Sequence, residues 1–170
     1  MTYGLRATNH PQQIAAHGTA PMFVLEDDPH RATDDRRTPP DLLAECLALA
    51  GLDGIDLDVA ATIDNTLAPH WCADGLLESW WGRVWCNPPY SDLEPWTRKA
   101  FIERQRCERI VMLLPANRTE QRWWQHQIEP ARLAGQIAVH FLARRRRFDQ
   151  PTPTPKRGDR PPFGLAVVVI

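Results

Sequence analysis

The most informative part of this sequence is Val84-Trp85-Cys86-Asn87-Pro88-Pro89-Tyr90. Its apolar first half is typical of the end of a buried strand. The strand must stop at Asn87, because two successive prolines have no N–H to donate to a sheet ladder. Ligands of open α/β sheets bind at this carboxyl end. This end of the strand carries the Asn87 amide, a backbone carbonyl and the Tyr90 ring, which together predict a clamp for a planar amine such as a nucleobase amino group. The alternative is a simple turn.

The composition is typical of one soluble globular domain. The chain has 170 residues, of which 43% are hydrophobic and 24% charged, and this length suffices for a single core. It contains neither an apolar run of membrane-spanning length nor a signal pattern, so we expect a cytoplasmic protein. The four cysteines have no CxxC spacing and the six histidines no ligand spacing. The sequence therefore predicts reduced thiols and no metal site.

Charge is distributed unevenly along the chain. The formal net charge is −1, yet residues 144–160 hold seven basic residues against two acidic ones, a net +5. The run begins with Arg144, Arg145, Arg146, Arg147 and Phe148. In a proline-rich loop this run predicts a cationic arm that contacts a phosphate backbone. The alternative is a solvated surface without a ligand.

The hydrophobic pattern divides the chain into an N-terminal extension, residues 1–36, and one domain, residues 37–170. The extension lacks periodicity and is expected to be partly ordered at most. In the domain we expect a helix with Thr38 as N-cap that ends at Gly51, and helices at 96–106 and 119–127. Strands are expected at 55–59, 83–86, 109–114, 136–142 and 163–170, the last being central or hairpin-paired because it is almost wholly apolar. This order predicts an α/β domain with a mixed, mostly parallel sheet.

An ordered series of short motifs resembles the phage-type DNA N-6-adenine methyltransferases, a Dam-like family. The resemblance covers about residues 38–170. Its elements are Thr38-Pro39, Leu57-Asp58-Val59-Ala60-Ala61, Asp74-Gly75-Leu76 with Trp80, Cys86-Asn87-Pro88-Pro89-Tyr90, Leu113-Leu114-Pro115 with Trp123-Trp124, and Arg147-Phe148. The resemblance implies an abbreviated Rossmann-like fold, S-adenosylmethionine as cofactor and DNA as partner. Tryptophans 80, 81, 123 and 124 are expected in the core.

The resemblance also implies which residues hold the cofactor. Thr38 and Pro39, at a helix N-terminus, would offer a hydroxyl and oriented N–H groups to the methionine carboxylate. Asp58 would face the amino group or the sulfonium of the cofactor. Ala60 and Ala61 are small enough to let the backbone approach the methionine chain.

The chain departs from most adenine methyltransferases in the middle of this series. It lacks their glycine-rich loop, and little chain is left before Asn87 for the strand whose acid usually binds the ribose. Asp64 and Asn65 are open alternatives for the ribose. Asp74 matches the acid that, in the family, accepts a hydrogen bond from the cofactor's adenine. For both Asp58 and Asp74 the alternative is that the carboxylate only caps a helix or stabilises a turn.

The implied reaction begins with an adenine flipped out of the duplex. Tyr90 of the Pro88-Pro89-Tyr90 turn would stack on this base, while the Asn87 oxygen and the Pro88 carbonyl would accept hydrogen bonds from its amino group. Asn87 would also border the cofactor. Phe148 would either stack on the base from the other face or anchor its loop. The open alternatives are an RNA adenine or a protein glutamine as acceptor, or a non-catalytic nucleic-acid-binding relative.

Overall fold

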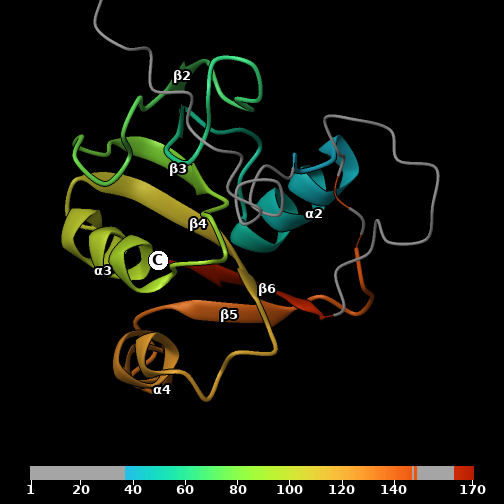
Figure 1. Ribbon diagram of the computed structural model, residues 1–170, viewed down its shortest axis with the longest axis vertical. Helices are drawn as coiled ribbons and strands as arrows, with labels where there is room; N and C mark the ends of the chain where they lie inside the picture. The colour runs from blue at the N-terminus through green and yellow to red at the C-terminus, as the bar shows by residue number, and fades with distance from the viewer. Residues whose placement is uncertain (1–36, 147, 149–162) are drawn as a thin grey trace, which may run out of the picture.

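The computed structural model of this chain describes residues 37–146, 148 and 163–170 (Figure 1). The expected N-terminal extension, Arg147 and most of the proline-rich part of the basic segment lie outside the described residues.

A six-stranded mixed sheet forms the centre of the domain, in the order β2-β1-β3-β4-β6-β5. The strands are β1 (Leu57–Asp58), β2 (His70–Trp71), β3 (Gly82–Cys86), β4 (Cys107–Pro115), β5 (Ala138–Phe141) and β6 (Leu165–Val169). The pairs β1–β2, β1–β3 and β3–β4 are parallel, whereas β6 runs antiparallel to both β4 and β5. The prediction of an α/β domain with a mixed sheet is confirmed, and the apolar last strand is central.

The short edge strand β2 was not expected from the sequence. It has two residues, His70 and Trp71, both of which are exposed. A strand this short carries no periodicity and its side chains face solvent, so no hydrophobic signal marks it. With two residues it is as short as the little chain between Asp58 and Asn87 allows, and neither of its residues is acidic.

Helices cover both faces of the sheet (Figure 1). Helix α2 (Pro40–Ala50) packs on one face, and α3 (Glu94–Glu103), the π-helix η1 (Trp124–Ile128) and α4 (Glu129–Leu133) pack on the other. Strand side chains alternate between the two layers: Val84 and Ile110 belong to the core under α3, and Trp85 and Val111 to the core under α2. This alternation of buried side chains is the packing that a central strand requires.

Helix α2 begins differently from the prediction. Its N-cap residue is Pro39, which makes no side-chain capping bond, so the assignment of Thr38 as N-cap was wrong. The C-terminal expectation is confirmed, because Gly51 caps the helix with φ of 69°, the left-handed region that glycine adopts readily.

The helix expected at 119–127 also differs. Regular helix begins at residue 122 and widens into η1 before α4 starts. Pro130 explains the change, because it cannot donate to the carbonyl four residues earlier and its ring clashes with that group. Trp80, Trp123 and Trp124 are buried as expected. Trp81 is not a core residue as predicted: it is 46% exposed and packs against the ring of His70 at the β2 edge.

No helix in the described part of the chain is long and apolar enough to cross a membrane. All four cysteines are free thiols, and three of them are buried.

Candidate active site

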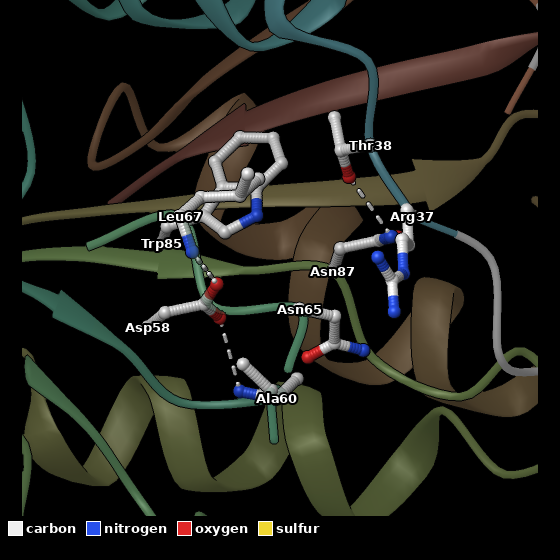
Figure 2. A pocket seen from close by; sticks show the side chains of 9 residues that line it. Arg37, Thr38, Asp58, Ala60, Asn65, Leu67, Trp85 and Asn87 are labelled. Carbon is white, nitrogen blue, oxygen red and sulfur yellow. Dashed lines mark hydrogen bonds between the residues drawn. The ribbon is translucent and has the colours of Figure 1, made fainter. Parts of the chain in front are cut away.

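A polar pocket lies at the carboxyl ends of β1 and β3. The chain passes from β1 outward to β2 and then returns to the other side of β1 with β3, so the strand order reverses between β1 and β3. Open α/β sheets bind ligands at such a switch point. The pocket is lined by Arg37, Thr38, Asp58, Ala60, Ala61, Asn65, Leu67, Trp85 and Asn87 (Figure 2). Five of the residues predicted for the cofactor site are therefore brought together here: Thr38, Asp58, Ala60, Ala61 and Asn87.

Asp58 is the last residue of β1 and is only 3% exposed. Its carboxylate accepts hydrogen bonds from the backbone N–H groups of Leu67 at 3.1 Å and Ala60 at 3.4 Å. Burial nevertheless raises the pKa of Asp58 from 3.8 to about 6, because desolvation of the charged form outweighs these two bonds. Within the described residues no cation forms an ion pair with Asp58, so the pocket holds a buried carboxylate whose charge is not neutralised.

Asn87 follows β3 directly and is half-buried. Its side-chain amide nitrogen donates a 3.1 Å hydrogen bond to the hydroxyl of Thr38, which is itself buried (Figure 2). The bond joins the end of β3 to the segment that enters α2. Pro88 behind it is buried, and Pro89 is partly exposed, so the two prolines hold the turn against the sheet.

Sequence reasoning missed three residues that line the pocket: Arg37, Leu67 and Trp85. Trp85 carries a usable signal, because it lies two positions before Asn87 on a strand that ends at the site. Arg37 and Leu67 carry none, since neither belongs to a motif. The pocket also separates the two ribose candidates: Asn65 lines it, whereas Asp64 is exposed and does not.

Asp74 does not line this pocket. Its carboxylate accepts hydrogen bonds from the backbone N–H groups of Leu76 and Leu77, and its own N–H donates to Glu78. These bonds correspond to the turn chemistry that was the alternative for Asp74. The turn nevertheless lies beside the site, because a Cβ on Gly75 would be 1.9 Å from the carbonyl oxygen of Val59. Only glycine leaves room for this close approach.

Tyr90 lies in an aromatic cluster. Its ring centroid is 6.3 Å from that of Phe148, in an edge-on arrangement, and 5.9 Å from that of Phe163. Phe148 is 4% exposed and belongs to the core under α2. Burial in the core is the environment expected for the second of the two roles considered for Phe148, that of an anchor. The Tyr90 backbone carbonyl accepts a hydrogen bond from Arg118, in the loop after β4.

The predicted cationic arm begins as an exposed segment. Arg144 and Arg145 are exposed, whereas Arg146 is half-buried and forms an ion pair with Glu45 of α2. Arg147 lies outside the described residues. The structure thus leaves two of the four consecutive arginines with side chains in solvent, next to a third that holds the segment to α2.

Within the described residues, no group of three or more His, Cys, Asp or Glu side chains is arranged to hold a metal ion.

The fold and the pocket together define an α/β domain with a polar ligand site at the switch point of its sheet. Comparison with known protein families gives a match: the family described as DNA N-6-adenine-methyltransferase (Dam) matches residues 27–145. The chain belongs to this family.

A relative with a curated name is similar over a short stretch. A protein named DNA N-6-adenine-methyltransferase from Escherichia phage T1 is 37% identical over 67 residues, which cover 36% of this chain and 28% of the phage protein. The similarity therefore spans less than a third of that relative's length. No solved structure matches the chain significantly.

Proposed function

We propose that this protein is a DNA adenine-N6 methyltransferase that takes its methyl group from S-adenosylmethionine. The observation that carries the proposal is the convergence of Asp58, Ala60, Ala61 and Asn87 on one pocket at the switch point of the sheet. Membership of the methyltransferase family and the similarity to the phage T1 protein support the same activity. The acceptor, DNA, would be met by a cytoplasmic protein of a bacterial or phage-infected cell.

The residues of the pocket fit the proposed cofactor. S-adenosylmethionine carries positive charge on its sulfonium and its ammonium group, and Asp58 is a buried carboxylate that no described cation neutralises. The small side chains of Ala60 and Ala61 leave the backbone open to a ligand, as glycines do in other nucleotide-binding folds. Asn65 is our candidate for the ribose, because it lines the pocket and Asp64 does not.

The sheet supports assignment to an abbreviated Rossmann-like class. The order β2-β1-β3-β4 is that of doubly wound α/β sheets, with β6 and β5 added at one edge. The glycine-rich loop of larger relatives is replaced here by the turn through Ala60 and Ala61. Asp74 is proposed as a cofactor contact only through its turn, since its carboxylate is bonded to backbone N–H groups.

The chain's own contribution to the reaction is positioning. When bound, the cofactor supplies a methyl group on a cationic sulfur, so the attacking amino group needs no base beforehand. Asn87 and the Pro88 carbonyl accept hydrogen bonds from that amino group and thereby aim its lone pair. Tyr90 stacks on the flipped base, a contact worth roughly 1–3 kcal/mol. Alignment of reactants of this kind contributes up to roughly 7–11 kcal/mol of barrier lowering.

The test is incubation of the purified protein with isotope-labelled S-adenosylmethionine and double-stranded DNA, followed by nucleoside analysis by mass spectrometry. We expect labelled N6-methyladenine from the wild type and almost none from Asn87→Ala. Parallel reactions with RNA and with protein substrates examine the alternative acceptors. Labelled product only in RNA would replace the proposed substrate, and cofactor binding without any product would favour a non-catalytic relative.

A further inference from the structure

We propose that Arg37 binds the carboxylate of the amino-acid end of S-adenosylmethionine, opposite Asp58, which binds the ammonium group of the same end. This inference rests on the proposed function and adds a specificity residue to it. Arg37 is the sole cation and Asp58 the sole anion among the nine described residues that line the pocket. A pocket with one charge of each sign fits a zwitterion.

The start of α2 is a poor site for that carboxylate. Pro39 is its N-cap residue and Pro40 its first helical residue, so neither offers an N–H group. Asp41 adds a negative charge in the first turn, which competes with an anion for the positive end of the helix dipole. The expectation that the N–H groups of this helix hold the carboxylate is therefore weak, and a separate cation is needed.

Arg37 is placed to supply this cation. The residue is exposed, and within the described residues it forms no ion pair. It directly precedes Thr38, whose hydroxyl accepts the hydrogen bond from Asn87, so its backbone is tied to the end of β3. A guanidinium at the pocket rim can bind a carboxylate through two parallel N–H bonds.

Asp58 lies on the other side of the pocket from Arg37, with Asn65 and Asn87 between them (Figure 2). Burial raises the pKa of Asp58 to about 6, as expected for a carboxylate that lacks a counter-charge. A ligand ammonium would supply that charge. The opposed charges would also fix the direction in which the amino-acid end enters the site.

Calorimetric titration of the full chain with S-adenosylmethionine and with decarboxylated S-adenosylmethionine, which lacks only the carboxylate, tests the proposal. We expect the wild type to prefer the complete cofactor by roughly tenfold or more, the range for a charge-assisted pair. Arg37→Met should lose this preference by weakening the complete cofactor alone. Arg37→Lys should retain part of it, since it keeps the charge but not the two-pronged donor.

The matched control is Arg98→Met, because Arg98 is exposed on α3, pairs only with Glu94 among the described residues, and lies outside the pocket. This variant should discriminate between the two compounds as the wild type does. Unchanged discrimination in Arg37→Met, with the same thermal unfolding midpoint, would overturn the proposal. So would a loss of DNA affinity alone, which would assign Arg37 to a phosphate. If the wild type binds neither compound, the proposed function itself fails.

Discussion

The side-chain amide of Asn87 donates a 3.1 Å hydrogen bond to the hydroxyl of Thr38, a residue 49 positions earlier in the chain. The bond closes the pocket between the end of β3 and the entrance to α2. It also fixes the plane of the amide, because with the nitrogen on Thr38 the carbonyl oxygen must point the other way. Thr38 thereby positions the group that we propose aims the acceptor amine.

Thr38→Val should slow methyl transfer. Valine has nearly the same shape but cannot accept the hydrogen bond, so the Asn87 amide loses its fixed orientation. One such bond contributes about 0.5–1.5 kcal/mol, which corresponds to a roughly two- to twelvefold lower rate. Single-turnover rates check this, and Thr38→Ser should restore them. Equal rates for the valine variant would show that Thr38 does not orient Asn87.

Asp58→Asn should stabilise the cofactor-free protein at neutral pH and not at acidic pH. Burial raises the pKa of Asp58 from 3.8 to about 6, so the folded state binds the proton more tightly than the unfolded chain. The stability that this proton contributes is complete below pH 3.8 and is lost as the pH rises through about 6, a difference of about 3 kcal/mol. Denaturant unfolding at several pH values should show a gap between variant and wild type that widens with pH. A constant gap would contradict the assignment.

Cofactor affinity should follow the opposite course in the wild type. The ionised carboxylate is the form that attracts a ligand ammonium, so affinity should rise as the pH increases through about 6. The rise should be absent in Asp58→Asn. Calorimetric titrations across this range check the prediction, and a wild-type affinity that does not change with pH would contradict a role for Asp58 in binding the ammonium.

Tyr90→Phe should reduce methyl transfer mildly and Tyr90→Ala severely, because stacking on a base requires the ring and not the hydroxyl. The alanine variant also removes the partner against which Phe148 and Phe163 pack, so its unfolding free energy must be measured alongside. Phe141→Ala is a suitable comparison, since that ring is 60% exposed and stacks on Trp124 instead. Equal losses of rate in Tyr90→Phe and Tyr90→Ala would argue that the hydroxyl carries the function.

Replacing Arg144 and Arg145 with alanine should weaken DNA binding and flatten its salt dependence. Both side chains are exposed, whereas Arg146 is engaged with Glu45. Each lost phosphate contact lowers the slope of log affinity against log salt by about 0.9, or about 1.8 for two. Arg98→Ala, on α3, is the control with the same loss of charge per residue. If log affinity fell with log salt at the same slope in the double variant and the wild type, these arginines would not contact phosphates and would belong to a solvated surface.

Glu103→Gln should destabilise the fold by about 1–3 kcal/mol. Its buried carboxylate pairs with Lys99 at 2.8 Å and Arg106 at 3.5 Å, and it accepts the backbone N–H of Trp80. Glu94→Gln is the comparison: its pair with Arg98 is exposed, and such a pair contributes about 0.3–0.5 kcal/mol. Denaturant unfolding measures both, and equal effects would show that burial of Glu103 adds nothing.

Features that local chemistry controls could be predicted from the amino-acid sequence. Two prolines after Asn87 stop β3 at Cys86, and the apolar runs at 109–114 and 165–169 are central strands because no other place in the fold covers both of their faces. Gly51 ends α2 for an equally local reason. The family resemblance carried by the motif series also implied that Thr38, Asp58 and Asn87 belong to one cofactor site, and all three line the same pocket.

Which other residues reach that site depends on tertiary packing. Arg37 and Leu67 line the pocket, the Asp74 carboxylate accepts hydrogen bonds from backbone N–H groups of its own turn, and Phe148 packs beside Tyr90 in the core. None of these outcomes has a periodicity or a spacing that marks it. Each outcome depends on how segments far apart in the chain pack against one another. A local sequence pattern indicates which residues of a segment are buried and where the helix or strand ends. It does not indicate which distant segment packs against it.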